Sequence, residues 1–218
     1  MKHLRLISLL ALLLVASCIG VYRANGPIES RSVMFTGDVT AIAVSYGMEV
    51  VVDAALAENE ARIVTHGDVI DYVKVYVEEQ TLYVKLDAPR PMSTNTLQVY
   101  IPKFNYSSLA ISAGAEFSDR VFSGEELTIA ASAGAEVDIS GEADTLTVAA
   151  SAGADLSLDE LRVKSATVSA SAGAEVEVYV TESLVANASA GAEVSYKGTP
   201  TNVDVSTSAG GSIERDND

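Results

Sequence analysis

Six near-copies of one short motif, at an almost constant spacing, constrain the fold of this chain more than any other feature. The motif reads SAGAE in its purest form, and the serines that begin successive copies are 20, 19, 20, 18 and 19 residues apart. Such a period is typical of folds in which one structural unit is stacked on the next. The copies begin at Ser112, Ser132, Ser151, Ser171, Ser189 and Ser208.

Apolar residues alternate with polar or small residues on both sides of the motif. In the second copy the alternation runs through residues 127–139 and includes Ala133 and Ala135 in the apolar series. A period of two is typical of β-strands with one face in the core. Continued through the motif, it predicts that both alanines point inward while Ser, Gly and Glu point outward together. The alanines would make each coil thin, and glycine would relieve strain at the outer bend.

We therefore predict an all-β fold built around a single-stranded parallel β-helix, or β-solenoid, with one repeat per coil. Equivalent residues would stack on neighbouring coils about 4.8 Å apart. The preference of parallel crossover connections for one hand favours right-handed winding. Two alternatives stay open. One is a left-handed hexapeptide helix of about 18 residues per coil, although no six-residue repeat is visible, and the other is an antiparallel sheet of hairpins.

The region before the repeats is also β-rich but less regular. Residues 32–105 contain several strand-like runs separated by turn residues, and Tyr46-Gly47 divides two apolar runs as a hairpin turn would. We predict one domain over residues 32–218, with irregular strands to residue 105, repeated coils over 106–214 and a polar tail over 215–218. The strand that leads into the first SAGAE favours one continuous core.

The first residues indicate export and a lipid anchor. Lys2 and Arg5 precede an apolar run too short to span a bilayer, and small residues then lead to Cys18, the only cysteine. VASC is similar to a bacterial lipobox, so we expect a signal peptide over 1–17, lipidation of Cys18 and a tether over 18–31. Ile19 favours the outer membrane. A plain secretory signal with an incidental cysteine is the alternative.

The net charge argues against partners that are themselves anionic. It is −16 for the whole sequence, and removal of Lys2 and Arg5 with the signal gives −16 − 2 = −18. A field of this sign repels nucleic-acid phosphates, so we predict no nucleic-acid partner. Contact with the membrane would come through the N-terminal lipid.

The chain resembles the bacterial auto-transporter adhesin head GIN domain family from about Arg31 to Glu214. The resemblance rests on SRSVMFTGDVTAIAVSYGMEVVV, YVKVYVEEQTLYVKLD and TLQVYIPKFNYSSLAISAGAEF, followed by coils with a small-residue triplet and an acid. In members of this family the triplet is usually Gly-Ser-Gly, whereas it is Ala-Gly-Ala here. The resemblance implies a β-helix similar to pectin-lyase-like solenoids and a role in adhesion or surface interaction. It brings no catalytic residues.

The motif predicts one outward column of side chains that repeats from coil to coil. Like charges one coil apart repel, so the repetition is either tolerated or used to bind a glycan or protein ligand. Calcium needs six to eight oxygens and the column supplies one carboxylate per coil, so we predict no cofactor, with calcium as an open alternative. The predicted surface-binding ladder consists of Ser132, Ser151 and Ser171 with Glu116, Glu136, Asp155, Glu175 and Glu193.

Catalysis is not predicted. His66 is the only histidine after the signal and lies in a turn, and the chain has no nucleophile elbow, phosphate loop or zinc spacing. A polysaccharide lyase or hydrolase that uses Asp138, Glu136, Arg162 and Lys164 is the enzymatic alternative, but identical columns argue against one asymmetric site. We predict a non-enzymatic envelope lipoprotein that acts as an adhesin, or alternatively as a structural periplasmic interaction module.

Overall fold

The computed structural model describes residues 21–216, and these residues are almost entirely β-structure. The one helical element among them is a short 3-10 helix, η2 (Ile70–Tyr72). Nothing in this part of the chain forms a helix with the length and apolarity needed to cross a bilayer. The signal peptide and Cys18, predicted from sequence, lie outside the described residues.

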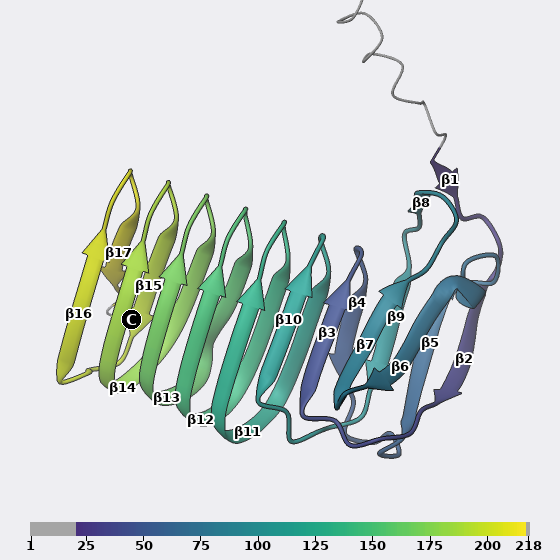
Figure 1. Cartoon of the computed structure of the whole chain (residues 1–218), viewed down its shortest axis with the longest axis horizontal. Helices are drawn as coiled ribbons and strands as arrows, with labels where there is room; N and C mark the ends of the chain where they lie inside the picture. The colour runs from purple at the N-terminus through teal and green to yellow at the C-terminus, as the bar shows by residue number, and fades with distance from the viewer. Residues whose placement is uncertain (1–20, 217–218) are drawn as a thin grey trace, which may run out of the picture.

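The repeats form a parallel β-solenoid, as predicted (Figure 1). Each long strand runs down one face, bends around an edge and runs up the other face. Neighbouring coils pair in parallel register, so Glu116 lies beside Glu136 and Ile129 beside Val148. This parallel pairing excludes the antiparallel sheet of hairpins. The coil strands are β10 (Ser108–Ser112), β11 (Glu116–Ala131), β12 (Glu136–Ala150), β13 (Asp155–Ala170), β14 (Glu175–Ala188), β15 (Glu193–Lys197), β16 (Asn202–Thr207) and β17 (Ser212–Arg215).

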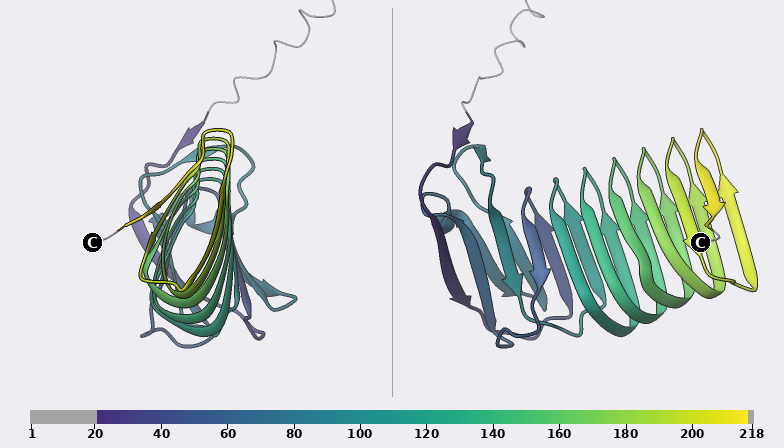
Figure 2. Two further views of the ribbon diagram at one scale, coloured as in Figure 1. Left: turned by 90° about the vertical axis from the view of Figure 1, so that its left-hand side faces the viewer. Right: turned by 180° about the vertical axis from the view of Figure 1, so that it is seen from behind.

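The winding is right-handed. In Figure 1 the strands nearest the viewer run upward, cross at the top to the rear face and run downward there, and each new coil is added on the left. The end-on view in Figure 2 shows two flat faces joined by narrow turns at one edge and by broad bends at the other. The left-handed alternative is therefore excluded.

The first coil begins well before the first SAGAE motif. Strands β3 (Ala41–Ser45) and β4 (Glu49–Val52) pair in parallel with β10 and β11, so they form a coil of the same solenoid. The expected hairpin at Tyr46-Gly47 is a turn, but its two strands lie on opposite faces instead of pairing. The chain then leaves the solenoid and adds β5 (Glu60–His66), β6 (Val73–Glu78), β7 (Thr81–Leu86), β8 (Met92–Ser93) and β9 (Leu97–Ile101).

These inserted strands extend both faces at the N-terminal end. Strand β7 pairs with β3 on one face, whereas β9 pairs with β4 on the other. Within the segment predicted as a tether, residues 28–31 differ from expectation. Strand β2 (Ile28–Met34) pairs antiparallel with β5, and β1 (Tyr22–Arg23) pairs with β8. Backbone hydrogen bonds to β5 and β8 therefore hold this segment against the fold.

One apolar core runs from the inserted strands through the coils. Its residues in the coils are aliphatic and mostly small, such as Val148 and Ala186, because the two faces lie close together. The larger side chains collect where the insertion meets the first coils, and Tyr106 contacts the rings of Phe117 and Phe122 there. The Tyr106 hydroxyl donates to buried Asp119 over 3.0 Å, which satisfies both polar groups.

Candidate functional site

A tight turn joins the two faces in every coil, and it decides where the side chains of the motif point. In the second copy Ala133 has φ 54° and Gly134 has φ 70°, so both residues are left-handed. Two left-handed central residues are typical of a type I′ turn. In the third copy the amide of Ala154 donates to the Ser151 carbonyl oxygen over 3.2 Å. The chain therefore reverses in the middle of the motif.

The prediction that both alanines point inward is wrong for the first one. Ala135 is completely buried, whereas Ala133 is exposed at the tip of the turn. The two left-handed residues interrupt the strand, so a period of two cannot be counted through them. Glycine does lie at the outer bend as expected. A Cβ at Gly134 would meet nothing within 4 Å, so the backbone conformation alone favours glycine there.

The same reversal separates the serines from the carboxylates. Ser132 precedes the turn and lies on the face formed by β10 and β16, whereas Glu136 follows the turn and lies on the face formed by β15 and β17. Sequence reasoning had placed both on one outward surface. The predicted ladder is therefore divided between two opposite faces.

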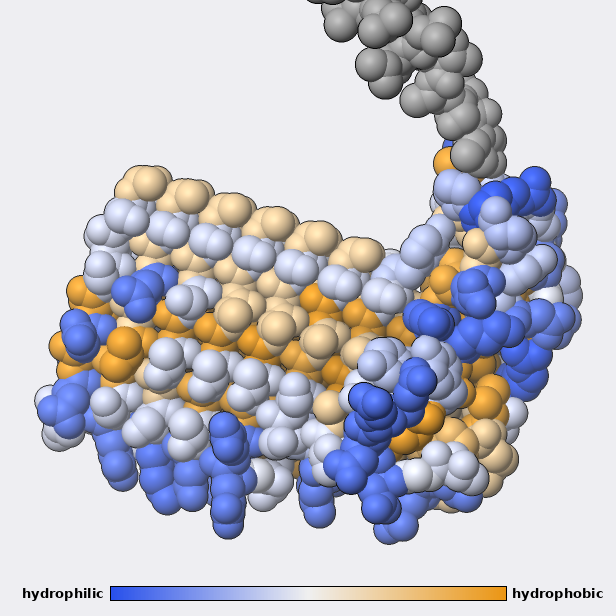
Figure 3. Space-filling model, in the orientation of Figure 1, coloured by the Kyte–Doolittle hydropathy of each residue, from blue (hydrophilic) through white to orange (hydrophobic). Residues whose placement is uncertain are grey.

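The serines belong to a surface that carries little charge. We call it the neutral face: the outward Ser, Thr and Ala of β10, of the last residues of β11, β12 and β13, and of the serine that follows each of these three strands. Figure 3 views the molecule from this side, and pale and tan rows run along the coils while blue side chains gather at the lower edge. Its members in the three central coils are Thr128, Ala130, Ser132, Thr147, Ala149, Ser151, Thr167, Ser169 and Ser171.

The carboxylates of the other face form one continuous column across six coils. Glu116 pairs with Glu136 on one side and with Glu49 on the other. We call this column the acidic ladder, and it contains Glu49, Glu116, Glu136, Asp155, Glu175 and Glu193. The five predicted carboxylates are thus brought together.

Glu49 is the member of the ladder that sequence reasoning missed, and a signal for it was present. Ser45-Tyr46-Gly47-Met48-Glu49 has the form of SAGAE with larger residues at two positions. Tyr46 and Gly47 both have positive φ, at 78° and 51°, so this stretch makes the same kind of turn. When copies of the motif are recognised by this turn, rather than by their alanines, residues 45–49 are the first copy.

Glu116 and Glu177 are two carboxyl groups of this face whose pKa values are raised. Burial against its neighbours raises the pKa of the Glu116 carboxyl, and the charges of Glu136 and Glu49 raise it further. A second carboxyl responds in the same way. Burial, with the nearby charge of Asp159, raises the pKa of Glu177 even though Lys197 opposes the shift. Ionisation of these two carboxyls is therefore less favourable than ionisation of isolated ones.

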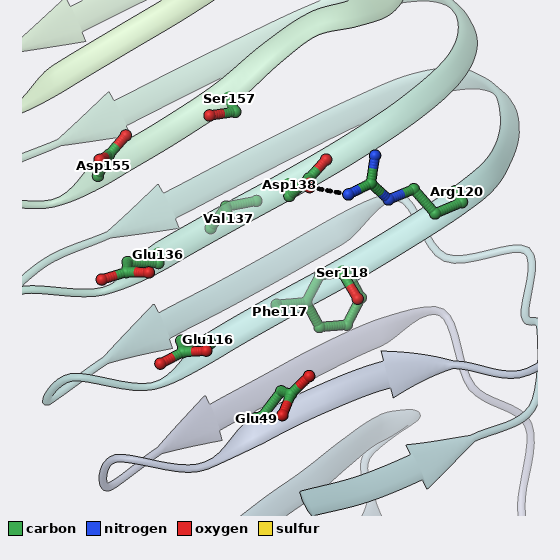
Figure 4. Close-up of a pocket in the computed structure, with 10 residues that line it drawn as sticks. All are labelled: Glu49, Glu116, Phe117, Ser118, Arg120, Glu136, Val137, Asp138, Asp155 and Ser157. Carbon is green, nitrogen blue, oxygen red and sulfur yellow. Dashed lines mark hydrogen bonds and ion pairs between the residues drawn. The ribbon is translucent and has the colours of Figure 1, made fainter.

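A shallow depression of about 340 Å³ lies over the first half of the ladder (Figure 4). Hydroxyls from Ser118 and Ser157 line it on either side of Asp138, in the row of side chains next to the ladder. Arg120 comes from the bend of β11 and forms an ion pair with Asp138, and its Nη1 lies 3.8 Å from Glu160 Oε2. The depression thus offers several acceptors, two hydroxyls and one cation. The remaining lining residues are Glu49, Glu116, Phe117, Glu136, Val137 and Asp155.

The residues considered for a lyase or hydrolase do not converge. Glu136 and Asp138 lie at the depression, whereas Arg162 and Lys164 line a separate hollow at the broad bends. Lys164 Nζ lies 2.6 Å from Asp144, and the Arg162 guanidinium lies 4.8 Å from the centre of the Tyr179 ring. These cations are paired locally, away from the ladder.

His66 lies between the N-terminal segment and the insertion. The His66 ring lies 2.6 Å from the Gly26 carbonyl oxygen and 2.8 Å from Asn95 Oδ1, so it links the N-terminal segment to the insertion. Those two hydrogen bonds, with Asn95 the stronger influence, raise the pKa of its imidazole. Among residues 21–216, no group of three or more His, Cys, Asp or Glu side chains is placed to hold a metal ion.

Comparisons with solved structures agree with this architecture. An adhesin candidate from Bacteroides fragilis NCTC 9343 is similar at a TM-score of 0.70 with 14% identity, over 90% of this chain and 100% of its own. One from Parabacteroides merdae ATCC 43184 gives 0.54 and 15%, over 88% and 98%. A structure described as a lipid binding protein candidate from Parabacteroides distasonis ATCC 8503 gives 0.53 and 17%, over 90% and 99%. At these identities the likeness shows the fold alone.

Sequence comparison identifies the family. No curated protein sequence matches the chain. A family profile does match residues 38–200, which include the first coil, the insertion and the coils as far as β15. The chain therefore belongs to the family described as "Putative auto-transporter adhesin, head GIN domain".

Proposed function

We propose that this protein is a non-catalytic adhesin of the bacterial envelope that binds a hydroxyl-rich glycan along its acidic ladder. The observation that carries the proposal is the parallel register of six carboxylates on one face. Such a column presents the same acceptor about every 4.8 Å, which suits a ligand that is itself repetitive. Membership of a family described as adhesins supports this role.

The chemistry around the ladder suits sugar hydroxyls. Carboxylates accept hydrogen bonds from hydroxyl groups, and such charge-assisted bonds are stronger than bonds between neutral groups. Ser118 and Ser157 flank Asp138 in the row next to the ladder, and their hydroxyls can both donate and accept. Several weak contacts repeated along one rigid face add up through multivalency.

A lipid on Cys18 would hold the protein at the membrane, most suitably the outer membrane. VASC supplies the sequence basis for this part of the proposal. The described chain enters the fold at β1, which lies at the N-terminal end of the solenoid (Figure 1). The coils would then extend away from the anchor and leave the ladder accessible. Labelling with a radioactive fatty acid should mark the wild type and leave Cys18→Ser unlabelled.

Glycan-array binding tests the recognition surface. We expect the wild type to bind a subset of glycans and a triple variant, Glu136→Gln with Asp155→Asn and Glu175→Gln, to lose that binding. The matched control carries Ser132→Ala, Ser151→Ala and Ser171→Ala on the neutral face and should bind as the wild type does. Equal binding by the wild type and the carboxylate variant would contradict the proposal.

The neutral face favours a second candidate, a structural module that docks a protein partner. Its small, uncharged side chains make a flat surface that two chains could share closely. Ser151→Glu would place a charge in the middle of this face without touching the ladder. Crosslinking in intact cells should then lose its partner band if the neutral face docks a protein, and keep it if the ladder is the recognition surface.

A further inference from the structure

The two ends of the solenoid differ in how their cores are covered. At the N-terminal end, shown on the right of Figure 1, the insertion and η2 close the core, and Val69 and Ile70 are buried there. At the C-terminal end β16 and β17 are the last strands, and among the described residues no strand pairs with their outer edges. Within residues 21–216, one end of the core is closed and the other is open.

Exposure at equivalent positions measures how open this end is. Val203 and Val205 of β16 pair with Leu184 and Ala186 of β14 and occupy the same inward positions. Their exposed fractions are 45% and 44%, against 0% and 1% for the residues they pair with. The two valines therefore present core-type side chains that lack a covering coil.

The open edge carries only part of the usual protection against strand pairing. Natural edge strands carry lysine, proline or a bulge that blocks addition of another strand. Strand β16 reads NVDVST, contains neither lysine nor proline, and has Asp204 as its one charged residue, while β17 carries Glu214 and Arg215. The acidic ladder stops here as well, because the residue that pairs with Glu193 is Ser212. Repulsion between carboxylates is thus reduced where another molecule would approach.

We propose that this end binds a second copy of the chain, end to end, through antiparallel pairing of β16 with β16 and of β17 with β17. A single added peptide strand could cover only one of the two edges. A second C-terminal end presents both edges at the right separation. A two-fold axis perpendicular to the flat faces superposes each face on its counterpart and reverses the strand direction.

The side chains at the edge fit this arrangement. In an antiparallel register with Ile213 opposite Ile213 of the second copy, Ser212 lies opposite Glu214, so a hydroxyl meets a carboxylate. On the other face, Val205 opposite Val205 places Asp204 against Ser206 in the same way. An acid at residue 212, as in the other coils, would instead oppose Glu214. Inward residues stay inward, so the exposed valines of the two copies cover one another.

Sedimentation velocity of the full chain in detergent, with micelles in excess over protein, tests the proposal over a concentration series. We expect the wild type to form dimers and Val205→Lys to raise the dissociation constant by at least about tenfold. The matched control is Val185→Lys, which changes an outward valine of similar exposure, 38%, inside the solenoid. It should dimerise like the wild type. Melting followed by circular dichroism checks that both variants fold.

Hydrogen exchange on the unchanged protein gives an independent result. The Ser208 amide donates to β14, so the alternate amides of Val203 and Val205 point to the open edge. They should exchange quickly in dilute samples and slowly in concentrated ones. A protein that stays monomeric up to about 1 mM overturns the proposal. So does a dimer that Val205→Lys leaves intact, or a monomer whose edge amides are already protected by another part of the chain.

Discussion

The two flat faces of the solenoid are formed by the same repeat, yet they differ in chemistry. One face carries the acidic ladder, in which Glu116 and its neighbours stand one coil apart, and the other carries Ser, Thr and Ala in the same parallel register. The turn between Ser132 and Ala135 produces the difference, because residues before it belong to one face and residues after it to the other. Two surfaces are therefore specified by one five-residue motif.

Separation of the faces means that each can change without the other. A substitution at Ser132 leaves the carboxylate column intact, and a substitution at Glu136 leaves the neutral face intact. The interior that lies between them is shared, and Ala135 and its equivalents are buried in it. The strongest test of the comparison is therefore made at the buried alanine of the turn, and weaker tests are made at its tip and on the ladder.

The largest effect is expected from Ala154→Leu. Ala154 is 1% exposed where the two faces converge, so a larger side chain would force them apart. Overpacking of this kind lowers the free energy of unfolding by about 1–3 kcal/mol. Ala152→Leu is the control, since Ala152 is exposed at the tip and should change stability by less than about 0.5 kcal/mol. Urea unfolding measures both, and equal losses would contradict the assignment of inside and outside.

An intermediate effect of opposite sign is expected at the tip of the turn. Ala133 is held at φ 54°, a conformation that is unfavourable for alanine and better tolerated by asparagine. Ala133→Asn should therefore increase the free energy of unfolding by about 0.5–1 kcal/mol. Ala130→Asn, at an exposed strand position on the neutral face, should give no such gain. A loss of stability in Ala133→Asn would argue against the left-handed turn.

The smallest effect is expected from the ladder itself, through pH. Because the pKa of Glu116 is raised above 4.5 in the folded protein, this group favours folding when protonated. The stabilisation is present at low pH and is lost as the pH rises through the raised pKa. Glu116→Gln should therefore flatten the change in melting temperature over this range. Glu125→Gln, outside the ladder, should leave the dependence as it is in the wild type.

The solenoid was predictable because its signal is repeated and local. Alternating apolar residues and near-constant spacing specify parallel coils, and Leu127 and Leu146 stack as that pattern requires. The outward direction of Ala133, and the division of Ser132 and Glu136 between two faces, were not predicted, because a period of two assumes an uninterrupted strand. Tyr46-Gly47 was recognised as a turn, whereas Ala133-Gly134 was expected only to be a bend in a continuous strand, although both pairs have positive φ. An alanine in the sequence does not indicate this turn, because alanine rarely adopts positive φ.

The long insertion could not be predicted for a different reason. The first coil ends with β4 and the second begins with β10. The strands of the segment between them pair with strands that are distant in the sequence. Pairing of β7 with β3 and of β9 with β4 depends on the whole solenoid end rather than on local pattern. Residues 28–31 of the predicted tether belong to a strand for the same reason, since β2 pairs with β5.

Stacking of the turns has a consequence for how such a protein can change in length. The amide of Gly134 donates to the Ala152 carbonyl oxygen, and the amide of Gly153 donates to that of Ala172, so each turn is joined to the next in the same way. Gain or loss of one complete repeat would leave both faces in register. It would change only the number of carboxylates in the column. For the polymeric glycan that we propose as ligand, the number of contacts, and with it the avidity, would change by whole coils while the chemistry of each contact stays the same.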